Sequence, residues 1–157
     1  MKIRLITVGA TSDRMMREAI EGYSRRVSHY IPFEIKNLPD VKAGKSTSEA
    51  RQKEMEGVQI LAQIGRSDRV VLLDERGKER TSREFAAEIE QQMVMLQSDL
   101  GFVVGGPYGY SPDVYSRANA MMSLTRMTMT HEMVRLFFVE QLYRAMTIIR
   151  GEPYHHD

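Results

Sequence analysis

Short runs of apolar and β-branched residues alternate along this chain with longer segments whose apolar residues recur at helical spacing. The short runs are typical of buried strands, and the longer segments are typical of amphipathic helices. This alternation predicts an α/β fold with a mainly parallel sheet. At 157 residues, the chain has the length of a single domain, 1–157, with a sizeable core. We expect strands at 2–8, 33–38, 69–73, 100–104 and 121–124.

Helix starts are marked by capping residues. Ser12 or Asp13 is expected to cap a helix that runs to about residue 29. Two capping boxes follow, Ser46-x-x-Glu49 and Thr81-x-x-Glu84, and Ser111-Pro112 opens a short helix. We expect the helix after the first box to stop at 65 and the last helix to span 131–149. The residues at 74–78 are predicted to form a polar turn.

The composition excludes several classes of protein. No stretch of about 18 apolar residues occurs, so we expect no membrane-spanning helix. There is no cysteine, which rules out disulfides and thiolate metal ligands and is consistent with a reducing cytoplasm. The net charge is +1 and the pI is about 8.0. This pI lies below the value of about 9 typical of a strongly nucleic-acid-binding domain, so overall charge does not predict a DNA or RNA partner.

Three loops that follow predicted strands form a candidate pocket: 73–78, 105–109 and 124–129. Ligands of parallel sheets bind at the carboxyl ends of the strands. Gly105-Gly106 would allow a ligand to approach the backbone closely, although a simple tight turn explains the pair equally well. The glycines match neither G-x-G-x-x-G nor the P-loop pattern, which disfavours a dinucleotide site and an NTPase.

The start of the last helix does not form a metal site. His131-Glu132 resembles the beginning of H-E-x-x-H, but Arg135 stands where the second zinc ligand is required. A zinc protease is therefore excluded, and no metal is expected. We interpret His131 as a helix cap or a core histidine.

Ionisable residues also gather near the end of the last helix and beyond it. Glu140 and Arg144 are four residues apart, so they form either a local ion pair or, if buried beside a pocket, a pair that holds a ligand. Tyr154-His155-His156 is either a disordered end or a reactive tail.

The last helix is apolar nearly all round, which is the pattern of a helix buried on most sides. In so short a chain, we expect a second copy to cover part of this helix. The sequence therefore predicts a homodimer.

Several motifs, each weak alone, together resemble those of the ribosomal RNA large-subunit methyltransferase H family over essentially the full chain. One departure is visible, because Thr130 stands where many members have proline before the histidine. The motifs are Lys2-Ile3-x-Leu5-x-x-Val8-Gly9, Leu73-Asp74 with Gly77-Lys78, Val104-Gly105-Gly106-Pro107-x-Gly109, His131-x-Met133-Val134-Arg135, Leu142-Tyr143-Arg144-Ala145 and Pro153-Tyr154-His155.

The resemblance implies a SPOUT-class fold whose carboxyl part forms a deep trefoil knot. It also implies an enzyme that uses S-adenosylmethionine, without a metal, to methylate N3 of a pseudouridine in 23S rRNA. The cofactor is expected to lie in the knot against the three loops. The contacts carried over by resemblance are Leu73, Gly105, Leu124, Thr125, Arg126, Met127, Thr128 and Met129.

Given that resemblance, we assign catalytic roles to three residues. Tyr154 and His155 are expected to position the target base, with His155 as proton acceptor. Arg144 is expected to stabilise charge on the base carbonyls. The modest net charge fits docking to an assembled ribosome through shape and local arginines. The alternative is a non-catalytic RNA- or nucleotide-binding module on the same fold, which would not need Tyr154 and His155.

Overall fold

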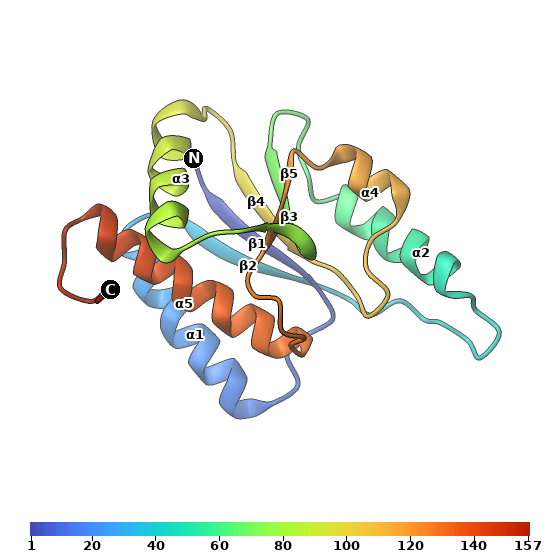
Figure 1. The fold of residues 1–157 in the computed structure, drawn as a ribbon. Coiled ribbons are helices and arrows are strands. Elements are labelled where there is room, and N and C mark those ends of the chain that lie inside the picture. The colour runs from blue at the N-terminus through green and yellow to red at the C-terminus, as the bar shows by residue number, and fades with distance from the viewer.

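Strands and helices alternate strictly from one end of the chain to the other (Figure 1). The computed structural model describes residues 1–157. The elements in order are β1 (Ile3–Val8), α1 (Arg14–Ser28), β2 (Phe33–Leu38), α2 (Glu49–Leu61), β3 (Arg69–Glu79), α3 (Ser82–Met95), β4 (Leu100–Val104), α4 (Pro112–Arg117), β5 (Ala120–Ser123) and α5 (His131–Ile149).

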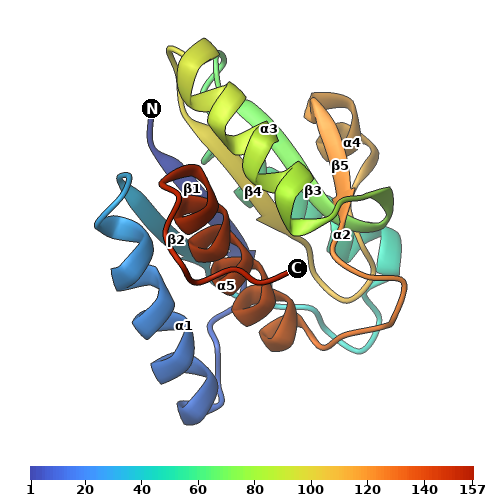
Figure 2. The ribbon, with the colours of Figure 1, turned by 60° about the vertical axis from the view of Figure 1, so that its left-hand side comes forward.

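The strands form one five-stranded sheet in the order β2-β1-β4-β3-β5, and every neighbouring pair is parallel. Helices α1, α3 and α5 cover one face, while α2 and α4 cover the other (Figures 1 and 2). The predicted α/β fold with a parallel sheet is therefore confirmed. Because all strands point the same way, their carboxyl ends meet along one edge, where a ligand site is expected.

Each face of the sheet has its own apolar core, because successive side chains of a strand point to opposite faces. In β4, Phe102 belongs to the larger cluster, under α1, α3 and α5, whereas Val103 belongs to the smaller one, under α2 and α4. In the larger core, Phe138 of α5 is fully buried, with its ring centroid 4.6 Å from that of Phe102. These contacts fix α5 against the centre of the sheet.

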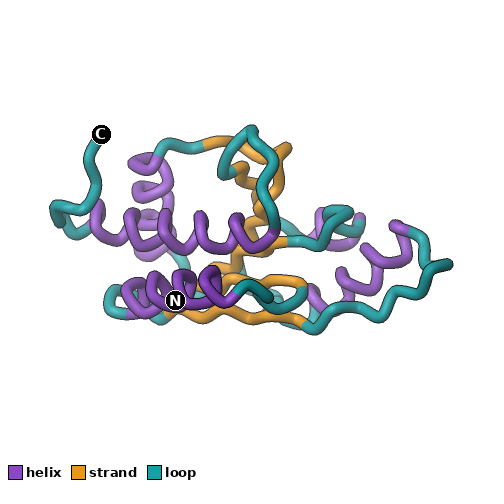
Figure 3. Tube along the Cα trace, turned by 90° about the horizontal axis from the view of Figure 1, so that it is seen from below, coloured by secondary structure: helices purple, strands orange, loops and turns teal.

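Helix α5 lies between α1 and α3 (Figure 2), and Figure 3 shows it running alongside α1. The two neighbouring helices and the sheet cover most of its apolar surface within a single chain. Met133 and Phe137, four residues apart on α5, stay 38% and 36% exposed. The sequence pattern thus overstated how much of the apolar surface of α5 needs a second copy of the chain to cover it. The exposed large apolar side chains of α5, Met133 and Phe137, both lie in its first half.

Most of the predicted capping residues do cap their helices, but one is wrong. Thr81 and Glu84 form the expected capping box, and Ser111 caps α4. Helix α2 is capped by Ser48, whose hydroxyl accepts a hydrogen bond from Arg51 N at 3.1 Å, and not by Ser46. The Thr47 hydroxyl accepts from Gly44 N instead, which keeps the preceding residues in a loop.

The predicted polar turn at 74–78 is also wrong, because β3 continues to Glu79. Its pairing with β5 is interrupted after Leu73 and resumes with Lys78 opposite Met122. A Cβ placed on Gly77 would lie 2.5 Å from Met122 N. Gly77 therefore serves the close approach of two backbones and not a turn.

Candidate active site

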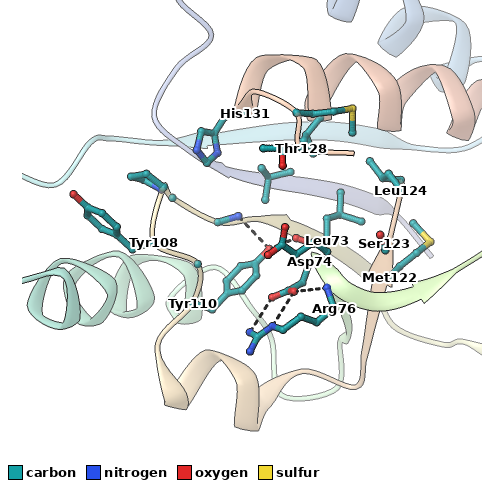
Figure 4. A pocket seen from close by; sticks show the side chains of 18 of the residues that line it. Leu73, Asp74, Arg76, Tyr108, Tyr110, Met122, Ser123, Leu124, Thr128 and His131 are labelled. Atoms are coloured by element: carbon teal, nitrogen blue, oxygen red, sulfur yellow. Dashed lines mark hydrogen bonds and ion pairs between the residues drawn. The ribbon is translucent and has the colours of Figure 1, made fainter. Parts of the chain in front are cut away.

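A cavity of about 630 Å³ opens at the carboxyl ends of β3, β4 and β5 (Figure 4). Three segments line it: residues 73–76, residues 104–110, and residues 122–129 except Arg126. The wall is completed by His131 and Val134 at the start of α5, Tyr115 of α4 and Lys53 of α2. The three loops predicted from the sequence to form a pocket are thus brought together around one space. Its volume is in the range of small-molecule sites, which is about 300–1,000 Å³.

Tyr110 braces the strand ends from beneath the cavity. Its buried hydroxyl accepts a hydrogen bond from Gly105 N at 3.1 Å. The single proton of this hydroxyl is shared between two acceptors, Leu73 O at 2.8 Å and Val103 O at 2.7 Å. Burial raises the pKa of Tyr110 above its ordinary value, so the phenol keeps its proton. The brace holds the ends of β3 and β4 and the Gly105 turn at fixed positions.

Asp74 and Arg76 lie together on one side of the cavity (Figure 4), and Tyr115 joins them to form a polar group of three side chains. Tyr115 donates a hydrogen bond to Asp74 at 2.7 Å, and Arg76 donates to Asp74 from its backbone N–H at 2.8 Å and from Nε at 3.2 Å. Burial alone would raise the pKa of Asp74, but the hydrogen bonds outweigh it and the net shift is downward. The cavity therefore holds an ionised carboxylate whose charge is paired with the Arg76 guanidinium.

The loop after β5 is shaped by its own hydrogen bonds. Ser123 Oγ donates to Thr125 O at 2.9 Å, and Thr125 Oγ1 accepts from Met127 N at 3.1 Å. At its end, Thr130 caps α5 by accepting from Met133 N at 3.2 Å. The residue that departs from the family pattern thus takes on a helix-capping role that proline cannot perform.

A second cluster lies at the end of α5 and joins the tail to the helix. Glu140 Oε1 accepts from Arg144 at 2.5 Å and from Tyr154 at 3.0 Å. The Arg144 guanidinium lies over the Tyr154 ring, 4.8 Å from its centroid, and 3.4 Å from His155 Nδ1. Burial and contacts with Tyr23 and Glu140 raise the pKa of Tyr154, which therefore stays protonated and donates.

The tail is also anchored beyond α5. The His155 ring lies 2.7 Å from Asp157, and Arg83 at the start of α3 forms a 2.5 Å ion pair with the same carboxylate. These two partners lower the pKa of Asp157 to about 2. Tyr30 donates to Glu152 at 2.5 Å, which raises the pKa of Tyr30 to about 12. The tail is therefore an ordered, hydrogen-bonded segment, and the interpretation as a disordered end is wrong.

Comparison with known proteins places the chain in a family. Residues 1–155 match the family described as "Predicted SPOUT methyltransferase". The chain belongs to this family. It is also similar to proteins named "Ribosomal RNA large subunit methyltransferase H": 50% identical to that of Porphyromonas gingivalis and 52% identical to that of Parabacteroides distasonis, each over 157 residues and 100% of both chains. The resemblance seen in the sequence is confirmed.

A solved structure supports the fold of this SPOUT methyltransferase. The probable methyltransferase from Bordetella pertussis Tohama I superposes with a TM-score of 0.58, over 92% of this chain and 94% of that one, at 10% identity. At so low an identity, the likeness concerns the architecture alone.

The structure assembles the residues expected at the cofactor site, with one exception. Those that line the cavity are Leu73, Gly105, Leu124, Thr125, Met127, Thr128 and Met129. The exception is Arg126, whose side chain is 90% exposed and pairs with Glu79 at 3.4 Å. Its charged group extends into solvent, so the contact of Arg126 with the cofactor stays a prediction for its backbone.

The residues expected to be catalytic lie together, but apart from the cavity. Arg144, Tyr154 and His155 form the tail cluster, and none of them lines the cavity of the same chain. Arg144 is ten residues beyond Val134, about 15 Å farther along the helix axis. Figure 3 shows the tail at the end of α5 opposite to the one that meets the cavity. The two groups of candidate residues thus lie apart within one chain.

Sequence reasoning missed the side chains that shape the cavity from below. Tyr110 and Tyr115 carry no signal in the sequence, since each acts through a fold-dependent contact. Asp74 follows directly after Leu73 at a strand end, a signal that could have identified it. His131 is neither a cap nor a core residue: it is the first residue of α5, exposed, and lines the cavity.

The structure contains neither a membrane-spanning helix nor a metal-binding cluster of side chains. None of the helices combines the length and apolarity needed to cross a membrane. Nowhere do three or more His, Cys, Asp or Glu side chains gather in a way that could hold a metal ion.

Proposed function

We propose that this chain transfers the methyl group of S-adenosylmethionine to N3 of a pseudouridine in 23S rRNA of the assembled ribosome, in the cytoplasm. The observation that carries the proposal is the cavity at the carboxyl ends of β3, β4 and β5, which is surrounded by the loops that the family resemblance assigns to the cofactor. Membership of the SPOUT methyltransferases and the names of the relatives support the reaction and the rRNA substrate.

The cavity suits a cofactor with an adenine base and a charged amino-acid end. Backbone N–H and C=O groups of residues 124–129 can bind the adenine edge, while Leu73 and Leu124 supply apolar contacts to its faces. Arg126 contributes through its backbone alone. The trefoil knot expected from the resemblance involves this carboxyl part of the chain and remains a prediction.

When bound, S-adenosylmethionine supplies an activated methyl group on a sulfonium. The reaction forms a bond between N3 and this methyl as the sulfur–carbon bond breaks, and the N3 proton must leave. His155 is the candidate acceptor: with its Nε2–H donated to Asp157, Nδ1 keeps a lone pair, and this atom takes the N3 proton once the base displaces the contact with Arg144. Tyr154, held as a donor by Glu140, positions the base, and Arg144 stabilises charge on its carbonyls.

The separation between the cavity and the tail cluster requires a second chain. Within one chain the catalytic candidates do not line the cavity. We infer that the protein is a homodimer in which the tail of one copy completes the cavity of the other. The exposed Met133 and Phe137, beside the cavity on α5, and the 80% exposed Met127 supply an apolar surface for this contact.

Two measurements test the proposal. Calorimetry should show binding of S-adenosylmethionine, and incubation with ribosomes should give N3-methylpseudouridine in 23S rRNA. Absence of cofactor binding would refute the assignment. Cofactor binding without methyl transfer would favour the non-catalytic module instead.

The composite site is tested by mixing two defective chains. One chain ends at Gly151, so it keeps its cavity and lacks its tail; the other carries Gly105→Val and keeps its tail. A heterodimer of the two has one complete site if the tail acts on the partner, and none if it acts within its own chain. Recovery of activity on mixing is expected, and light scattering should report a dimer at micromolar concentration.

A further inference from the structure

A second cavity, of about 400 Å³, lies directly beside the first. The two share Gly106, Pro107 and His131 as lining residues, so they adjoin along these residues. The rest of the second cavity is formed by the loops after β1 and β2, one face of α2 and the start of α5. A ligand in it would lie next to the cofactor site, at the shared edge formed by Gly106.

The α2 residue Glu56 carries a buried oxygen without a partner in this second cavity. The residue is only 3% exposed. Its Oε1 accepts from Gln52 Nε2 at 3.1 Å, while Oε2 has no hydrogen-bond partner. A Cβ on Gly106 would lie 2.3 Å from Oε2, so only glycine leaves room for the carboxyl group against the wall. A buried acceptor left unpaired is costly, which indicates that a ligand donor completes it.

Two other charged groups of the second cavity, Glu132 and Arg135, are held by hydrogen bonds, although Arg135 Nε has no partner. Glu132 accepts hydrogen bonds from Ser12 N at 2.6 Å and Ser12 Oγ at 2.7 Å. Arg135 donates to Thr11 Oγ1 at 3.0 Å and to Val8 O at 2.8 Å, and these bonds tie α5 to the end of β1. Among the carboxyl groups that line this cavity, Glu56 is the one that is buried and keeps an oxygen without a hydrogen-bond partner.

The charge of the lining selects the class of ligand. Asp40, Glu56 and Glu132 outnumber Arg135, so the lining disfavours a phosphate group. No metal-binding group of three side chains is formed here. A neutral ring that presents N–H donors fits both observations.

The target base of the proposed reaction is such a ring. Pseudouridine is joined to its ribose through carbon, so both ring nitrogens, N1 and N3, carry a proton, whereas uridine has only the N3 proton. With N3 directed at the methyl donor, N1–H still needs an acceptor. We propose that the target base occupies the second cavity and that Glu56 Oε2 accepts a hydrogen bond from its N1–H. Glu56 is then the residue that selects pseudouridine over uridine.

This inference rests on the proposed function, and its test separates the two. Single-turnover methylation is measured on ribosomes whose target position holds pseudouridine or uridine, with Glu56→Met, which removes the acceptor at similar length. The pseudouridine rate should fall roughly 10- to 100-fold, the loss of a hydrogen bond to a charged group. The uridine rate and the affinity for S-adenosylmethionine should not change.

The matched control is Glu54→Met, the same change two residues earlier on α2. Glu54 is 60% exposed and pairs only with Arg51, so this variant should keep the wild-type preference. Glu56→Gln, which keeps a neutral acceptor, should lie between wild type and Glu56→Met. It provides a second variant if the methionine protein does not fold.

The reciprocal change is made on the RNA. A target carrying N1-methylpseudouridine lacks the donor, so wild type should lose the same roughly 10- to 100-fold, while Glu56→Met should not distinguish it from pseudouridine. Equal losses on pseudouridine and uridine in Glu56→Met, or a wild type without preference for pseudouridine, would overturn the role of Glu56. A wild type that methylates neither substrate would refute the proposed function itself.

Discussion

The cavity at the sheet edge and the cluster at the tail are held by different forces. The cavity walls are strand ends fixed by backbone pairing and by the buried hydroxyl of Tyr110. The tail is held by side-chain pairs, of which Arg83 with Asp157 is exposed to solvent. A change in the cavity therefore disturbs the fold around it, whereas the tail can be altered or removed while the core stays intact.

The largest effect is expected from Gly105→Val. From the sequence, glycine at 105 would allow a ligand to approach the backbone, so a valine side chain would be expected to enter the space of the cofactor. In the structure, a Cβ at Gly105 lies 2.9 Å from Tyr110 Cε1, so it displaces the tyrosine brace. Overpacking of this kind costs about 1–3 kcal/mol of stability, and the shifted strand ends should abolish cofactor binding in calorimetry.

The control is a matched pair of alanine variants, Gly105→Ala and Gly22→Ala. A Cβ on Gly22, in α1, meets nothing within 4 Å, so this variant should bind cofactor normally and be slightly more stable. A folded Gly105→Val protein with wild-type affinity would show that the brace is not needed.

Removal of the tail is expected to separate chemistry from cofactor binding. A chain ending at Gly151 keeps α5 and all the residues that line the cavity. It should bind S-adenosylmethionine as wild type does, yet lose about 10²–10⁴-fold in single-turnover methyl transfer, the usual contribution of a positioned acid–base group. Full activity would mean that the base lies elsewhere, with Glu140 as the next candidate.

A smaller loss is expected from His155→Ala, because Tyr154 and Arg144 remain in place. If His155 accepts the N3 proton, the rate should fall by up to about 10²-fold and the rate–pH profile should change between about pH 6 and 9. Single-turnover assays across this range give the profile. An unchanged profile would assign His155 to positioning alone.

The smallest effect concerns the anchoring of the tail. The pKa of Asp157 is lowered to about 2, so the ion pair that holds it is present at neutral pH and is lost only as the pH falls toward that value. In Arg83→Gln, Asp157 should protonate nearer its ordinary pKa of about 4, so the tail should detach at higher pH than in wild type. NMR of the His155 and His156 ring protons in an acid titration reports the detachment.

Comparison of the predicted and observed elements shows where local signals suffice. The bounds of β2, β4 and α5 agree with the structure, because each is a strongly patterned segment between clear stops. The start of α2 was misplaced because several hydroxyl residues precede it, and only the fold decides which one meets a free N–H. The continuation of β3 was missed because its polar residues pair with a strand more than 40 positions away.

The sequence by itself determined the alternation of elements, the parallel sheet and the three loops that surround the cavity, since these follow from periodicity, caps and the geometry of parallel strands. Only the tertiary structure decided that Tyr110 braces the strand ends, that Glu56 is buried without a partner for Oε2, and that the tail lies apart from the cavity of its own chain. Each of these depends on contacts between residues distant in sequence, and no local pattern encodes which distant side chain will meet a given backbone group.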